Sequence, residues 1–126
     1  MKASNVLVHA HRPDAPDHSK YRTWLESTLG ADSAYGVSDL VLSGFLRVVT
    51  HARVFREPTP LQKALSFVTE VRDRPNAVGI APGPRHWEIF TRFCQECEVR
   101  GNLVPDAWLA ALAVESGCEW VTTTVW

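Results

Sequence analysis

The stretch NLVPDAWLAALAVESGCEWVTT, residues 102–123, decides the fold expected for this chain. Pro105 is predicted at the first helical position of an apolar segment that continues to Val114 and stops at Gly117. Residues 118–123 then have the pattern of a buried strand. A helix that leads through one glycine into a hydrophobic strand is the second half of a βαβ unit, so a parallel sheet flanked by helices is predicted.

Asp106 is the polar exception in this stretch. A carboxylate in the first turn of a helix complements the unpaired N–H groups and the helix dipole, so a purely structural role explains it. A functional role explains it equally well. The pattern alone leaves both explanations open.

Hydrophobic runs and turn residues alternate through the rest of the chain. We predict a first, central strand at residues 6–8 and further short strands at residues 34–37 and 78–80. The helices are expected to run from Asp17 to Gly30, from Ser38 to Val49, from Thr59 to Pro75, and from Trp87 to Gly101. This order predicts a three-layer α/β domain with a central parallel sheet.

The composition is that of one ordinary globular domain spanning residues 1–126, with 45% hydrophobic and 21% charged residues. The formal charge of −1 gives no overall attraction to nucleic acid, so RNA binding would need a local basic face. No segment has the pattern of a signal peptide or the length of a membrane span, so we expect a cytoplasmic protein without a membrane partner. The three cysteines are expected to be free thiols.

Four segments resemble the PIN-domain ribonuclease toxins of the VapC type, and in particular their mycobacterial-like branch. GNLVPDA at residues 101–107 resembles the start of the fifth helix of these toxins. NVLVHAHR at residues 5–12 resembles their opening strand, and SDLVLSGFLRVVT at residues 38–50 is similar to their second helix. PGPRHW at residues 82–87 matches a motif of the mycobacterial-like branch.

The resemblance implies a metal-dependent endoribonuclease that cleaves RNA phosphodiester bonds. Its cofactor would be Mg²⁺, with Mn²⁺ as the alternative, and such ions require clustered carboxylates at the carboxyl ends of the strands. The implied partner is a cognate VapB-type antitoxin, which would lay a helix and an extended tail over the acidic groove. The resemblance also implies a homodimer.

Three positions follow from the resemblance as candidate site residues. Asp106 matches the acid of the fifth helix and is predicted to be catalytic and a metal ligand. Asn5 is predicted to position the metal site. Asp39, at the start of the second helix, is a candidate substitute acid, although complementing the helix dipole explains it as well.

The chain departs from the family pattern where further acids are expected. Ala3 and Thr124 stand where these toxins carry aspartates, and the family's last helix and edge strand are not expected here. A truncated toxin, an inactivated one and a degenerate gene product each fit these departures. We therefore expect weak Mg²⁺ binding and poor RNA cleavage. The alternative function is a catalytically inactive PIN scaffold that binds the antitoxin or RNA.

Candidate RNA-binding residues are chosen for their side chains, because arginine forks match the geometry of phosphate. They are Arg12, Arg47, Arg85 and His86. A scattered solvated face or internal ion pairs would explain the same residues.

Overall fold

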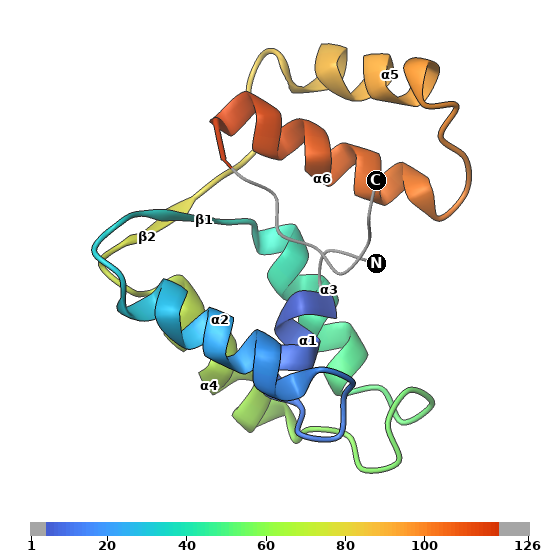
Figure 1. The fold of residues 1–126 in the computed structure, drawn as a ribbon. Helices are drawn as coiled ribbons and strands as arrows, with labels where there is room; N and C mark the ends of the chain where they lie inside the picture. Colours follow the sequence, from blue (N-terminus) through green and yellow to red (C-terminus); the bar gives the residue numbers. More distant parts are fainter. Residues whose placement is uncertain (1–4, 119–126) are drawn as a thin grey trace.

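The computed structural model describes residues 5–118, with side chains described from Val6 onward. The elements in chain order are α1 (Asn5–His11), α2 (His18–Gly30), β1 (Tyr35–Val37), α3 (Asp39–Val49), α4 (Leu61–Arg72), β2 (Ala77–Gly79), α5 (His86–Glu96) and α6 (Leu103–Ser116) (Figure 1). The strand predicted at residues 118–123 lies outside the described residues except for Cys118, which belongs to no element.

Strands β1 and β2 form a parallel pair in which Tyr35 lies opposite Ala77 and Val37 opposite Gly79. Parallel strands need a crossover connection, and α3 and α4 provide it. In Figure 1, α5 and α6 lie above this sheet and α2 and α4 lie below it. The predicted α/β domain with a parallel sheet flanked by helices is confirmed.

The predicted first strand at residues 6–8 is wrong, because these residues belong to helix α1. The backbone N–H of Arg12 donates to the carbonyl oxygen of Val8 at 2.9 Å, which extends the helical hydrogen bonding to the end of the element. Val6, Val8 and Ala10 are buried where α1 packs against α2 and α3. A short uninterrupted apolar run fits a buried strand or a buried helix equally well, and only the packing distinguishes them.

Two hydrophobic clusters lie on opposite faces of the sheet. Tyr35 and Val37 belong to the larger cluster, which is formed mainly by α1 to α4. The smaller cluster is built from α6 and includes Ile80 just after β2. Gly36 points to this second side, where a Cβ atom would lie only 3.2 Å from both Ile80 and the sulfur of Cys118. The absence of a side chain at residue 36 therefore allows the end of α6 to approach the sheet.

The helix ends are close to those predicted, with differences at α5 and α6. Helix α6 begins at Leu103, two residues before Pro105, and ends at Ser116, where Gly117 caps it in a left-handed conformation with φ 69°. Helix α5 ends at Glu96, well before the predicted stop at Gly101. Within the described range, no helix is long and apolar enough to cross a lipid bilayer.

The imidazole of His11 packs inside the larger cluster. Its ring centroid lies 5.4 Å from that of Phe45 and 4.7 Å from that of Phe67, and Nε2 lies 3.2 Å from the hydroxyl oxygen of Thr59. Burial, followed by the positive charges of Lys63 and Arg12, holds the pKa of His11 below its ordinary value of 6.5. The folded state therefore keeps this ring neutral where the unfolded chain would protonate it.

We predict that His11 makes the free energy of unfolding decrease as the pH is lowered. The stabilisation that comes from the neutral ring is complete above pH 6.5. It is lost as the pH falls from 6.5 toward the lower pKa that His11 has in the folded state. Urea denaturation at about pH 7.5 and about pH 5.5 measures this difference. His11→Gln should reduce this difference. An equal pH dependence in the parent and His11→Gln chains would contradict the prediction.

Candidate functional site

Asp106 lies in the first turn of α6 and has an exposed fraction of 0%. Its neighbours Ala107 and Leu109 are also buried. Removing a carboxylate from water costs several kcal/mol unless its surroundings compensate. Complementing the helix dipole does not require burial, because carboxylates on the surface do so as well. The helix dipole alone therefore does not explain the depth of Asp106, and its catalytic role stays a prediction.

Asp39 has different surroundings from Asp106. Its side chain is 75% exposed, and its carboxylate accepts a hydrogen bond from Nε of Arg72 at 2.9 Å. That hydrogen bond is the main cause that lowers the pKa of Asp39. Asp39 thus links the first turn of α3 to the last turn of α4 at the surface. This arrangement favours an electrostatic role for Asp39 over that of a substitute metal ligand.

The described residues do not contain a complete metal site. Within residues 5–118, no group of three or more histidine, cysteine, aspartate or glutamate side chains is arranged to hold an ion. Asn5 is the first residue of α1, and its side chain lies outside the described set, as do Ala3 and Thr124. Asp106 offers the hard oxygen that Mg²⁺ prefers, but a dedicated site needs several such ligands.

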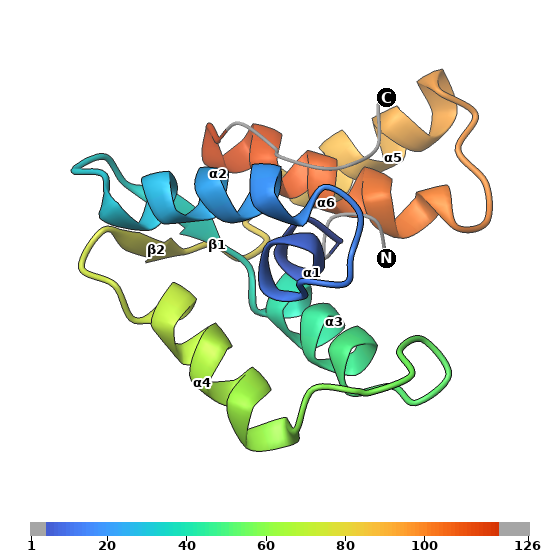
Figure 2. The same ribbon diagram turned by 60° about the horizontal axis from the view of Figure 1, so that its bottom comes forward.

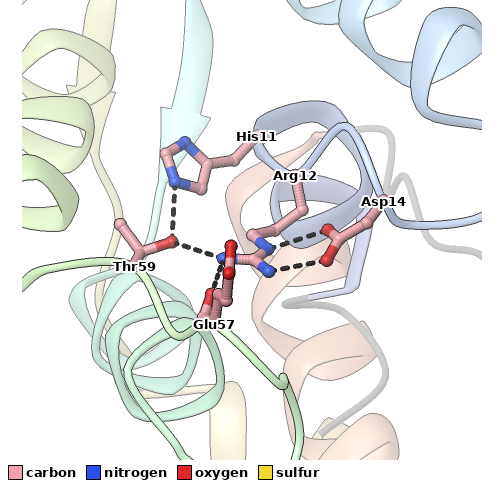
Figure 3. A network of polar contacts seen from close by, with 5 residues as sticks. All are labelled: His11, Arg12, Asp14, Glu57 and Thr59. Atoms are coloured by element: carbon pink, nitrogen blue, oxygen red, sulfur yellow. Dashed lines mark hydrogen bonds and ion pairs between the residues drawn. The ribbon is translucent and has the colours of Figure 1, made fainter.

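The guanidinium group of Arg12 is enclosed by contacts within the protein (Figure 3). Nε and Nη2 donate to the two carboxylate oxygens of Asp14 at 2.9 and 2.6 Å. Nη1 donates to the carbonyl oxygen of Glu57 at 2.7 Å and to the hydroxyl oxygen of Thr59 at 3.2 Å. The group also lies 4.0 Å from the ring centroid of Phe55. These contacts favour the internal ion pair over an RNA contact for Arg12.

The other three candidate RNA-binding residues differ in their exposure to solvent. His86 is 3% exposed, its Nε2 donates to the carbonyl oxygen of Trp108 at 2.9 Å, and its ring centroid lies 4.5 Å from that of Trp108. It therefore joins α5 to α6, and a structural role is favoured. Arg47 and Arg85 are exposed, and the structure records no ion pair for either within the described chain. Both stay predicted RNA contacts.

Glu115 is a polar residue of structural importance that the sequence analysis missed. Its carboxylate accepts hydrogen bonds from the backbone N–H groups of Gly83 at 2.7 Å and Arg85 at 2.9 Å. The bond from Gly83 is the main cause that lowers the pKa of Glu115. A Cβ atom on Gly83 would lie 2.7 Å from Oε2 of Glu115, so any larger residue at position 83 would require this carboxylate to shift. The proline-flanked glycine is a visible signal, but nothing in the sequence pairs it with Glu115.

Comparison with known protein families adds the decisive observation, because residues 4–124 match the PIN domain. The chain belongs to the PIN-domain family. Three relatives from Mycobacterium tuberculosis indicate the VapC type within it. Ribonuclease VapC25 is 42% identical over 118 residues, which are 94% of this chain and 83% of the relative. Ribonuclease VapC31 is 41% identical over 94% of this chain and 84% of its own length, and Ribonuclease VapC43 is 43% identical over 94% and 80%.

The PGPRHW segment of this PIN domain has a structural explanation. Residues 82–85 connect β2 to α5, and their backbone N–H groups hold the carboxylate of Glu115 near the end of α6. His86, the next residue, bonds to the backbone of Trp108 in the middle of α6. One short segment therefore fixes α5 to α6 at two points, and α6 carries Asp106.

We predict that Gly83→Ala lowers the stability of the domain slightly, because the new methyl group forces the carboxylate of Glu115 to shift from its hydrogen bonds. In a Glu115→Ala background the methyl group meets no carboxylate, so the same substitution should cost little. Urea denaturation of the parent, the two single variants and the double variant measures this coupling. Additive effects of the two substitutions would show that the contact is not formed.

We predict that Arg12→Met lowers the free energy of unfolding by about 2 kcal/mol. Methionine keeps the packing against Phe55 but leaves the oxygen atoms of Glu57 and Thr59 without their donor. Arg22→Met is the matched control, because Arg22 forms an exposed ion pair with Glu26 at 2.9 Å and should contribute less than about 0.5 kcal/mol. Equal losses in the two variants by urea denaturation would contradict the role assigned to Arg12.

Proposed function

We propose that this chain is a VapC-type ribonuclease that hydrolyses RNA phosphodiester bonds with Mg²⁺, or alternatively Mn²⁺. The complete burial of Asp106 at the start of α6 is the observation that carries the proposal. The matched relatives are named ribonucleases, which supports the same activity here. Asp106 is the proposed catalytic residue and metal ligand, and Asn5 is proposed to position the site.

The proposed ligand is held on a rigid element. Buried Ala107, Ala111 and Leu112 fix α6 against the rest of the domain, and α5 packs along it. A carboxylate on a packed helix keeps one orientation, which reduces the reorganisation needed when a ligand binds. A divalent ion, when bound, would activate a water molecule and neutralise charge on the phosphate. Among the described residues, Asp106 is the proposed hard oxygen donor for it.

The proposal includes a VapB-type antitoxin as the partner and a homodimer as the assembly. Leu103 and Val104 are exposed in the same turn of α6 that carries Asp106. They offer an apolar surface beside the proposed metal ligand, as a helix of the antitoxin would require. An antitoxin seated there would cover the approach to Asp106 and prevent RNA from reaching it.

A second candidate function is a PIN scaffold that binds the antitoxin or RNA without cleaving. Two observations favour it. The described residues lack a cluster of three metal-binding side chains, and Ala3 and Thr124 replace the acids expected from the family. Such a protein would keep the family's binding surfaces but not its chemistry.

We predict that Asp106→Asn weakens Mg²⁺ or Mn²⁺ binding by at least about tenfold. Asparagine has the same shape but lacks the charge that attracts the cation. Asp39→Asn is the matched control and should leave metal binding unchanged, because Asp39 is exposed and paired with Arg72. Calorimetric titration with each metal, together with cleavage of a labelled RNA, measures both effects.

The outcomes separate the two candidate functions. Metal binding that depends on Asp106 supports the nuclease, whereas binding that is unchanged in Asp106→Asn contradicts it. If the parent neither binds metal nor cleaves RNA, a chain that carries both Ala3→Asp and Thr124→Asp distinguishes a disabled enzyme from a binding scaffold. Cleavage gained by that chain identifies a disabled enzyme, and continued inactivity favours the binding scaffold.

A further inference from the structure

The arginines of this domain differ in whether an acid neutralises them. Several arginines in helices or just after them have acidic partners: Arg22 with Glu26, Arg74 with Glu70, Arg92 with Glu88, and Arg72 with Asp39. Arg47, Arg53 and Arg56 form no ion pair with any residue that the structure describes. All three are exposed and lie within ten positions of one another.

These arginines belong to a continuous segment that we call the basic loop, defined as residues 47–58. It begins in the last turn of α3 and continues into the connection to α4. His51 is also exposed in it, and Glu57 is the single acid between residues 40 and 69. The basic loop therefore concentrates positive charge in a chain whose formal net charge is −1.

The basic loop is held in place by its own hydrogen bonds. The backbone N–H groups of Val54 and Phe55 both donate to the carbonyl oxygen of His51, at 3.0 and 3.2 Å. The N–H of Arg53 donates to Nδ1 of His51 at 3.1 Å, and the N–H of Thr59 donates to the carbonyl oxygen of Val49 at 2.8 Å. The ends of the segment are thus joined, and its arginine side chains extend from an ordered backbone.

Arg12 anchors the basic loop to the body of the domain (Figure 3). Its guanidinium group covers the ring of Phe55 and donates to the carbonyl oxygen of Glu57, both within the loop. Asp14 neutralises the charge of Arg12 through two hydrogen bonds. Arg12 is therefore a positioning residue, and the exposed arginines are left to contact a ligand.

We propose that the basic loop binds the phosphate backbone of the RNA substrate through Arg47, Arg53 and Arg56. Arginine forks match phosphate oxygens, and charges spread along a segment suit a polyanion better than a small anion. The cavity of about 470 Å³ beside the sheet includes none of these residues, which argues against a small-molecule site. This inference rests on the proposed function, because it names the surface that would hold the substrate.

The basic loop and the start of α6 lie apart in the domain. Figure 1 shows the connection after α3 at the lower right and the N-terminal end of α6 at the upper right, and the two are also separate in Figure 2. Asp106 lies in that first turn of α6. RNA held by the basic loop would have to extend across the domain to reach the proposed metal ligand.

Binding of a short fluorescein-labelled single-stranded RNA, measured by anisotropy in EDTA over a series of salt concentrations, tests the proposal. EDTA removes divalent metal, so binding is measured without cleavage. Arg53→Gln/Arg56→Gln should weaken binding by roughly tenfold and reduce the slope of log Kd against log salt by about 0.7 for each phosphate that is no longer neutralised. Arg53→Lys/Arg56→Lys should retain most of that salt dependence, because it keeps the charge.

The control is Lys20→Gln/Arg100→Gln, which removes two exposed positive charges outside the basic loop. It should change RNA affinity much less than the loop variant does. Equal losses in both chains would overturn the proposal in favour of a general effect of net charge. Unchanged binding in the loop variant, or no RNA binding by the parent chain, would also overturn it. Urea denaturation of each variant shows whether the fold is retained.

Two further measurements separate this inference from the proposed function and from another polyanion. If RNA binds through the basic loop but is not cleaved in Mg²⁺, the role of the loop in RNA binding is supported and the proposed nuclease activity is contradicted. If the loop substitutions leave cleavage unaffected, the nuclease activity is supported and the role of the basic loop in RNA binding is overturned. Sedimentation with vesicles of phosphatidylglycerol and phosphatidylcholine tests a lipid surface. If the loop arginines are needed for vesicle binding but not for RNA binding, the RNA assignment is wrong.

Discussion

The parallel pairing of β1 and β2 is the constraint on which the rest of the structure depends. Parallel strands cannot be joined by a tight turn, so the chain must cross over, and α3 and α4 form that crossover. The chain then leaves β2 at the same end of the sheet at which it leaves β1. From there the chain continues through residues 82–85 into α5 and α6, which cover the second face of the sheet.

Polar contacts between segments that are distant in the sequence also hold the fold together. Arg12 joins the end of α1 to the connection between α3 and α4, and Glu115 joins the end of α6 to the start of α5. Each contact uses backbone groups of a loop, which would otherwise need water or another partner. The loops around the domain are therefore ordered by side chains that come from helices far away in the sequence.

The charged residues divide into those that stabilise the fold and those that remain for binding. Arg12 and Asp39 were candidates for function, yet both have partners that account for them structurally. Arg47 keeps an exposed and unneutralised charge together with Arg53 and Arg56, as far as the described residues extend. A chain with almost no net charge can thus present a local basic surface, because nearly all of its acids lie outside the basic loop.

The sequence by itself determined the α/β class, the PIN resemblance and the positions of α2, α3, α4 and α6, because caps, glycines and helical periodicity act over a few residues. Only the tertiary structure decided that residues 6–8 are helical, since a short apolar run takes the conformation that its packing permits. It also decided the surroundings of Arg12, His86 and Glu115. Apart from Asp14 beside Arg12, the hydrogen-bond partners of their side chains lie 22 to 47 positions away, and no local pattern specifies contacts over that separation.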